Sequence, residues 1–255
     1  MAGATLLVFS NAVWAEASEQ LWPVVKEAFF ANRTIENADF IKISGPRRAE
    51  SGAQVPITLS VDQSSGAALI KNVYIIVDAN PIQLAATYHL TESLGNLQLS
   101  TRIRMETDSY VRAIGETADG KLYMSAVAIR AAGGCGGTVD NNEAEIRATA
   151  GKIKMNVESP VKIGVATPAT FIIKHPMRTG LQRDLVSQGF VPAFYIQKAA
   201  FTFNGKPLMN VDFGVGTSED PYLRFDIVPN APGKLDVQAV DNEGTSFKHE
   251  IEVKS

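Results

Sequence analysis

The sequence has little of what metal sites, redox pairs and membrane spans require. It contains one cysteine and three histidines in 255 residues, and no Cys-x-x-Cys or His-x-x-x-His spacing that would hold a zinc ion. A lone cysteine has no resolving partner, which argues against a thiol redox enzyme. No apolar run reaches the ~18 residues of a membrane span. We therefore expect no metal, no cofactor and no membrane contact.

Basic charge and catalytic motifs are lacking as well. The net charge is −3, and lysine and arginine are scattered except for the pair Arg47 and Arg48, so a nucleic-acid partner is not expected. The chain has no G-x-S-x-G motif, and its "GGCGGT" stretch does not fit the dinucleotide-binding pattern G-x-G-x-x-G. The carboxylates are dispersed. We assign no catalytic residue and expect a protein that is not an enzyme.

The pattern that is present is that of β-strands. Apolar and polar residues alternate in 97–105, 222–227, 234–240 and 247–253, while 72–79 is a continuous apolar run typical of a strand covered on both faces. This pattern predicts an all-β protein built of β-sandwich domains.

Turn and helix signals complete this interpretation. Hairpin signals occur at Gly120, at Asn204-Gly205 and at Gly244, where tight turns need positive φ angles. One short helix is expected over 23–32, starting at Pro23 and presenting three side chains to the core. These three are Val24, Ala28 and Phe29.

A polar, glycine-flanked stretch divides the chain. The stretch "GGTVDNNEAEIRATAGK" reads as a linker between two strand-rich segments. We expect a β-sandwich over 18–132, an arm and linker over 133–152, and a second β-sandwich over 153–255. Residues 1–17 resemble the remnant of an export signal without its positively charged start, which predicts a periplasmic protein. A loose N-terminal tail is the alternative.

The single cysteine, Cys135, lies between two pairs of glycines: Gly133, Gly134, Gly136 and Gly137. Neighbours without Cβ atoms would leave the sulfur exposed on a pliable segment that can reach into another protein. A free thiol is partly thiolate at neutral pH and can exchange with sulfur species. No base or metal ligand is adjacent in sequence, so this arrangement indicates a handle for cargo. The alternative is a glycine-rich turn whose thiol is incidental.

The three histidines are best explained as structural residues. His249 alternates with the apolar residues of its strand, and His89 ends an apolar strand. His175 lies where a strand enters a loop, and we expect a structural role there as well.

Several motifs in order resemble a known family. Residues 29–137 resemble SoxY and residues 153–253 resemble SoxZ, the two subunits of the periplasmic SoxYZ sulfur carrier of thiosulfate oxidation. The motifs that carry the resemblance are "FFANRTIENA", "RRAESGAQVPITLSVD", "STRIRM", "GGCGG", "HPMRTGLQRD", "VPAFYIQKAAFTFNGKPLM", "DPYLRF" and "VDNEGTSF".

The resemblance implies two immunoglobulin-like sandwiches and a role for Cys135 as the covalent attachment point of a sulfur-containing intermediate. It implies transient partners: a c-type cytochrome that joins thiosulfate to the cysteine, and a hydrolase that releases sulfate. A disulfide-linked homodimer through Cys135 is a further expectation. The rival hypothesis is an immunoglobulin-like adaptor in which the thiol has no role.

Two features depart from the family pattern. The glycine arm of SoxY is a free C-terminus, whereas here the chain continues, so the arm must enter partner sites as a loop. Arg178 stands where SoxZ usually has glutamate, which could alter a partner surface or the cargo preference. Both features resemble SoxYZ-like carriers associated with quinoprotein dehydrogenases, whose cargo is not established.

Overall fold

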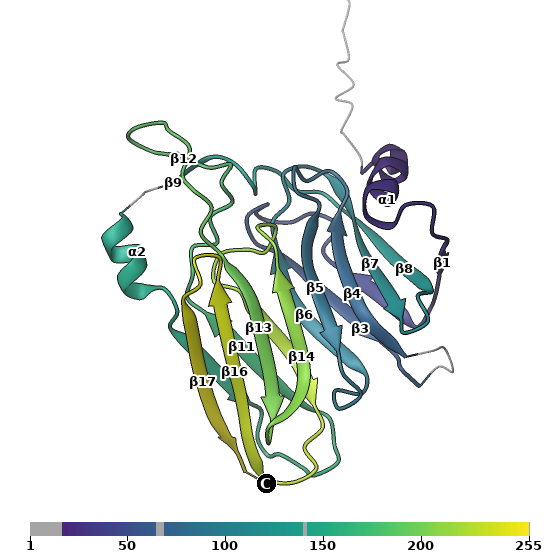
Figure 1. Cartoon of the computed structure of the whole chain (residues 1–255). Helices are drawn as coiled ribbons and strands as arrows, with labels where there is room; N and C mark the ends of the chain where they lie inside the picture. The colour runs from purple at the N-terminus through teal and green to yellow at the C-terminus, as the bar shows by residue number, and fades with distance from the viewer. Residues whose placement is uncertain (1–16, 65–68, 140–141, 255) are drawn as a thin grey trace, which may run out of the picture.

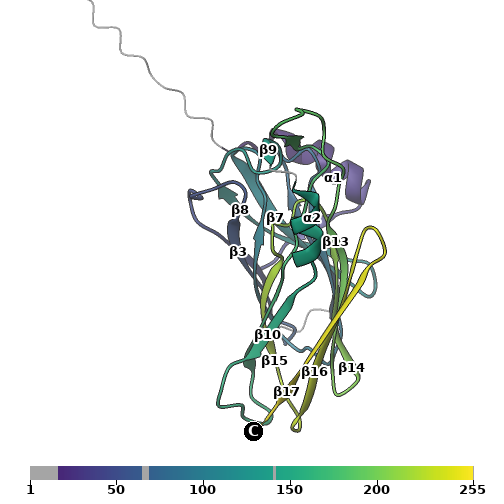
Figure 2. The same ribbon diagram turned by 90° about the vertical axis from the view of Figure 1, so that its left-hand side faces the viewer.

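The protein is built of two large β-sheets packed face to face (Figures 1 and 2). The computed structural model describes residues 17–64, 69–139 and 142–254. The expected all-β class with immunoglobulin-like sandwiches is confirmed. The region read as an export-signal remnant, 1–17, lies outside the described residues except for Ala17. No helix among the residues described is long and apolar enough to cross a membrane.

The larger sheet has nine strands, and it takes them from both halves of the chain. In spatial order they are β1 (Ile35–Asn37), β8 (Leu122–Ile129), β7 (Ser109–Thr117), β4 (Ile70–Val77), β5 (Leu84–Leu90), β14 (Lys206–Phe213), β13 (Ile196–Phe203), β16 (Gly233–Asp241) and β17 (Ser246–Val253). The pairing is antiparallel except between β1 and β8, which run parallel.

The second sheet has six strands, also drawn from both halves. Their order is β10 (Ile153–Val157), β11 (Thr167–Ile173), β15 (Tyr222–Ile227), β6 (Leu97–Ile103), β3 (Val55–Val61) and β2 (Ile41–Ser44). A separate pair, β9 (Thr138–Val139) and β12 (Arg183–Asp184), lies near helix α2 at the upper end of Figure 1.

The two halves are joined by strand pairing rather than placed one after the other. In the larger sheet β5 pairs with β14, and in the smaller sheet β6 pairs with β15. Their inner faces form one continuous hydrophobic cluster. In the second half of this cluster the ring of Phe201 packs edge-on against Phe171 and Phe225, with ring centres 5.2 and 5.1 Å apart. The two sandwiches therefore form one extended body, while the boundaries at 132 and 153 stay a prediction.

The strands predicted from alternation are present, because burial on one face dictates a period of two. β15 covers the range expected, and its burial alternates strictly along the strand. The predicted hairpin turns also form. Asn204 and Gly205 have φ of 49° and 74°, as the turn between β13 and β14 requires. Gly120 and Gly244 have φ of 83° and 88° in the other two turns.

The predicted N-terminal helix is confirmed as α1 (Trp22–Phe30), with Pro23 in its first turn. The face that it buries was predicted wrongly. Val24, Ala28 and Phe29 are exposed, while Val25 and Phe30 are buried.

The reason is the contact that orients α1. The Arg112 guanidinium lies 4.2 Å from the centre of the Trp22 ring and forms a buried ion pair with Asp78 at 2.8 Å. It also binds Glu19, just before the helix, at 2.5 Å. Trp22 is thereby held against the sheet. Val25 and Phe30, three and eight positions later, lie on the same side of the helix and are buried.

The segment expected to be a linker contains a second helix, α2 (Glu143–Thr149). It begins with Glu143 and Glu145 and has Arg147 in its last turn, the charge order that the helix dipole favours. Arg147 also pairs with Glu243 beyond β16, which fixes α2 to the second half of the chain.

Because the two halves share one core, a destabilising substitution in one half should also destabilise the other. Replacing Phe201 with alanine should lower the free energy of unfolding by about 3–5 kcal/mol. Amide exchange of β7, which lies in the first half, should accelerate together with that of β16. Fast exchange confined to the second half would contradict a common core. Exposed Val228→Ala is the control that should leave both unchanged.

Candidate functional site

Cys135 lies in the loop that follows β8, between the two halves of the molecule, and its thiol is buried. Only 5% of the residue is exposed. The expectation that this thiol stands out on an open arm is therefore wrong for this conformation. The reason is a set of main-chain hydrogen bonds that fold residues 133–137, here called the arm, back onto the protein.

The first half of the chain holds the arm through the segment after β6. Gly133 and Gly134 donate their N–H groups to the carbonyls of Glu106 and Met105 at 2.8 and 3.0 Å. The side chain of Glu106 accepts two more N–H groups, from Cys135 at 2.8 Å and from Gly136 at 3.2 Å. Four consecutive amides of the arm are thus satisfied by this one segment.

The second half of the chain closes over the arm from the other side. The Thr179 hydroxyl donates to the Cys135 carbonyl at 2.8 Å. The N–H of Arg183 donates to the Gly137 carbonyl at 2.8 Å, where the parallel pairing of β9 with β12 begins. The arm is therefore fastened at both ends and belongs to the contact between the two halves.

The four glycines have different structural roles. Gly133 and Gly137 adopt φ of 70° and 94°, which side chains rarely tolerate. A Cβ on Gly134 would lie 2.0 Å from the Gly52 carbonyl oxygen, so this position requires glycine for close packing. Gly136 has only a Glu106 oxygen near its Cβ position, at 4.0 Å. Their predicted contribution to arm flexibility stays a prediction.

The surroundings of the thiol keep it protonated. Burial and, to a smaller extent, the Glu106 carboxylate raise the pKa of Cys135 to about 11, while the Arg104 guanidinium opposes both. At neutral pH the buried sulfur is therefore a neutral thiol, a weak nucleophile.

Arg104, like Glu106 and Thr179, is a residue of this site that sequence reasoning missed. It lies directly after β6 and shares with Arg102 the polar face of the strand predicted over 97–105, yet only 4% of it is exposed. Its guanidinium donates to the carbonyls of Gly134 at 3.1 Å and Met177 at 3.3 Å, and so links the arm to the second half. Burial lowers its pKa from the ordinary value.

A cavity of about 570 Å³, here called the arm pocket, opens beside the arm. Its walls come from both halves, from the arm itself and from α2. Among its lining residues are Arg104, Gly134, Gly136, Arg178, Gln182 and Glu219. The glycines on both sides of Cys135 line the pocket, while Cys135 itself does not.

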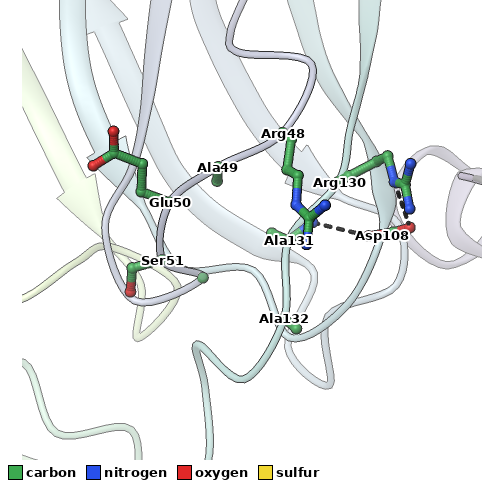
Figure 3. Close-up of a pocket in the computed structure, with 9 residues that line it drawn as sticks. Arg48, Ala49, Glu50, Ser51, Asp108, Arg130, Ala131 and Ala132 are labelled. Atoms are coloured by element: carbon green, nitrogen blue, oxygen red, sulfur yellow. Dashed lines mark hydrogen bonds and ion pairs between the residues drawn. The ribbon is translucent and has the colours of Figure 1, made fainter.

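A second cavity of about 450 Å³ lies at the base of the arm (Figure 3). Asp108 accepts the N–H of Ala131 at 2.9 Å and pairs with Arg130 at 3.5 Å. Figure 3 shows Arg48 pointing into the same cavity from the segment that pairs with the chain at Arg130. Asp108 thus fixes the point at which the chain leaves β8 for the arm.

Arg178 is buried and does not belong to a partner-binding surface, contrary to the expectation that it could alter one. It is 4% exposed, and its guanidinium pairs with Glu143 of α2 at 3.3 Å. Its backbone exchanges hydrogen bonds with Phe194. The arginine joins α2 to the loop that covers the arm, so it acts within the protein, beside the arm pocket.

The histidines occupy structural positions. His175 is 1% exposed and packs on Phe194, with ring centres 4.3 Å apart, and burial lowers its pKa to about 4. His89 is part-exposed and bonds to Asn72 and Asp212. His249 is half-buried on β17. Within the described ranges no three His, Cys, Asp or Glu side chains are grouped to hold a metal ion.

Comparison with known families identifies both halves. Residues 26–135 match the family of the sulfur oxidation protein SoxY, and residues 153–252 match that of the sulphur oxidation protein SoxZ. The chain is a SoxY–SoxZ fusion. The SoxY match ends at Cys135, and the SoxZ domain begins at β10. The two families support a sulfur carrier in sulfur oxidation.

Among solved structures, the sulfur carrier protein SoxY from Chlorobium limicola f thiosulfatophilum is 24% identical, with a TM-score of 0.36, over 42% of this chain and 88% of its own. A superoxide reductase from Ignicoccus hospitalis is 22% identical, with a TM-score of 0.30, over 46% of this chain and 91% of its own. A family 2 glycosyl hydrolase from Bacteroides cellulosilyticus DSM 14838 is 12% identical, with a TM-score of 0.25, over 79% of this chain and 24% of its own. These likenesses are too distant to bear on activity. No curated protein matches the chain at a significant level.

The buried thiol predicts slow chemistry. At pH 8, iodoacetamide should modify Cys135 at least about 100-fold more slowly in the folded protein than in urea, because a pKa raised from 9.0 to about 11 removes thiolate. Thr179→Val removes the bond to the Cys135 carbonyl and should speed the folded-state reaction. The control Thr202→Val, on β13, should not. Equal rates in folded and unfolded protein would contradict the closed arm.

The buried His175 predicts a loss of stability in acid. Its pKa is about 4 in the folded protein and about 6.5 in the unfolded chain, so the unfolded state binds more protons between these values. Stability is complete above pH 6.5 and should fall by about 3 kcal/mol as the pH drops to 4.

Urea unfolding at several pH values, compared between the wild type and His175→Gln, measures this effect. The variant should show a flatter profile between pH 6.5 and 4. Parallel profiles for His175→Gln and the wild type would show that this imidazole does not carry the effect.

Proposed function

We propose that the SoxY–SoxZ fusion is a periplasmic carrier that holds a sulfur-containing intermediate, of thiosulfate or sulfane-sulfur type, covalently on Cys135. The observation that carries the proposal is the position of Cys135. The match to SoxY ends on this residue, and the residue lies beside a pocket formed by both domains. Partner redox enzymes would load and unload it.

Delivery requires the arm to open, because the thiol is buried when the arm is closed. Opening breaks the hydrogen bonds of Cys135 and Gly136 to Glu106 and the bonds donated by Thr179 and Arg183. Such bonds contribute about 0.5–1.5 kcal/mol each, so the open arm is a minor state that a partner can select. The closed state would shield the thiol and its adduct between visits to partners.

The chemistry would belong to the partners. The Glu106 carboxylate is occupied by main-chain N–H groups, and the thiol is neutral, so Cys135 has no activated base at hand. We infer that the protein is a carrier and not an enzyme. Its partners would be a c-type cytochrome, a sulfate-releasing hydrolase or a quinoprotein dehydrogenase, each bound transiently. A Cys135-linked homodimer would form only from the open arm.

The buried thiol favours a second candidate. If the arm never opens, the protein is an immunoglobulin-like adaptor of a periplasmic quinoprotein dehydrogenase system, and Cys135 serves only packing. The two candidates differ in whether Cys135 carries a covalent adduct in the cell.

Intact-mass analysis of protein isolated from its native periplasm distinguishes them. We expect an added mass on Cys135 that a reductant removes and that the Cys135→Ala variant lacks. The variant should stay within about 1 kcal/mol of the wild type in stability, since a small side chain is exchanged for another. Unmodified thiol while the partners are active, with full cellular function of Cys135→Ala, would establish the adaptor instead.

A further inference from the structure

The hairpin at 183–190 presents large apolar side chains to solvent beside the arm. It begins with β12 and extends beyond the two sheets at the upper end of Figure 1. Leu185, Val186 and Phe190 are 58, 90 and 64% exposed, and no charged residue lies between 185 and 190. Single exposed apolar residues are ordinary on a protein surface, but a group of them on one short hairpin marks an interaction site.

The hairpin is held in one shape by its own polar groups. The Asp184 carboxylate accepts the N–H groups of Val186 and Ser187 at 3.2 and 2.6 Å. The Arg183 guanidinium lies 4.3 Å from the centre of the Phe190 ring. The apolar side chains are therefore presented by an ordered turn, so little conformational entropy is lost when another protein binds them.

The same hairpin fastens the arm. The Arg183 N–H donates to the Gly137 carbonyl at 2.8 Å, where β12 pairs with β9. The Leu185 N–H donates to the Val139 carbonyl at 3.0 Å. Gly137 is the last residue of the arm, two positions after Cys135. A protein whose reactive centre reaches Cys135 therefore approaches beside this hairpin.

The size of the apolar group fits a brief contact with another protein. With Leu181, which is 38% exposed, the side chains present on the order of a few hundred Å² of surface, well below the ~800 Å² that a stable complex buries on each partner. A permanent dimer through the hairpin is thus not favoured. A small area suits the visit of an enzyme that acts on Cys135, because a carrier must dissociate after each visit.

We propose that the 183–190 hairpin is the docking element for the enzyme that loads Cys135, and that its side chains enter an uncharged, apolar depression beside the opening of that enzyme's active site. The proposal rests on the carrier function and adds the surface by which the carrier is recognised. Docking here brings the partner to the pairing of β9 with β12, where the closed arm is fastened to the second half. Recognition and access to the arm thus occur at one place.

Paired serine substitutions test this in the whole protein. The reduced wild type, the Leu185→Ser/Val186→Ser variant and an Ile163→Ser/Val165→Ser control are each added to a periplasmic extract of the native host that lacks its own copy of the protein. The appearance of the adduct on Cys135 is followed by intact mass. The control residues are 45 and 50% exposed and lie in the loop that follows the end of β10 away from α2.

The Leu185→Ser/Val186→Ser variant should be loaded at least about tenfold more slowly than the wild type, as expected when buried apolar contacts are lost from a complex. The control should be loaded at the wild-type rate. Iodoacetamide in buffer should modify Cys135 equally in all three, because the substituted side chains are exposed and the main-chain bonds to the arm remain.

Two results of these measurements would overturn the proposal. One is equal loading of the wild type and the Leu185→Ser/Val186→Ser variant. The other is faster iodoacetamide modification of this variant in buffer, which would show that the apolar side chains act on the arm and not on a partner.

Two further measurements identify other occupants of the hairpin. A wild-type dimer in sedimentation that the Leu185→Ser/Val186→Ser variant does not form would assign the hairpin to a second copy of the chain. Binding of the wild type, but not of this variant, to vesicles of phosphatidylethanolamine and phosphatidylglycerol would assign it to a lipid surface. Either result would also overturn the proposal.

The outcome is separable from that of the carrier function. Equal loading of the wild type and the Leu185→Ser/Val186→Ser variant would remove the docking role and leave the carrier. Absence of an adduct on the wild type while the partners are active would remove the carrier, and the docking role with it.

Discussion

The antiparallel pairing of β5 with β14 and of β6 with β15 is the constraint on which the rest of the structure depends. Because both sheets cross from the SoxY domain to the SoxZ domain, the domains cannot hinge about a single line of contact. The loops at one end of each domain are thereby fixed against each other. Thr179 and Arg183 reach the arm only because the sheets hold them there.

The site that results is organised by two opposite charges, Arg104 and Glu106, which lie two residues apart in the segment after β6. Glu106 binds the arm through its amides, and Arg104 binds it through a carbonyl. Their effects on the thiol oppose each other, and burial decides the balance in favour of the protonated form. The same contacts that fix the arm therefore lower its reactivity, so accessibility and nucleophilicity change together when it moves.

The features that depend on local interactions, such as single strands and tight turns, were predicted from the sequence. The strands over 222–227 and 247–253 follow from alternation, and the Asn204-Gly205 turn follows from its positive φ angles. The pairing of strands between the halves left no such signal, because register between distant segments depends on the assembled core.

The glycines around Cys135 were ambiguous for a physical reason. A residue without Cβ permits both free motion and close approach, and at Gly134 the close approach prevails. The burial of Arg104 was hidden because alternation identifies a face of the strand, but not what later covers it. In α2 the charge order of a helix was present, yet its polar composition resembled a linker.

Covalent continuity between the domains has a consequence for assembly. β5 and β14 pair within one molecule. The segment that joins the two domains keeps their effective concentration high. The cell need not match the synthesis of two subunits, and neither edge remains unpaired when one is in excess. The ratio of the two domains is fixed by their covalent link, and dilution cannot separate them.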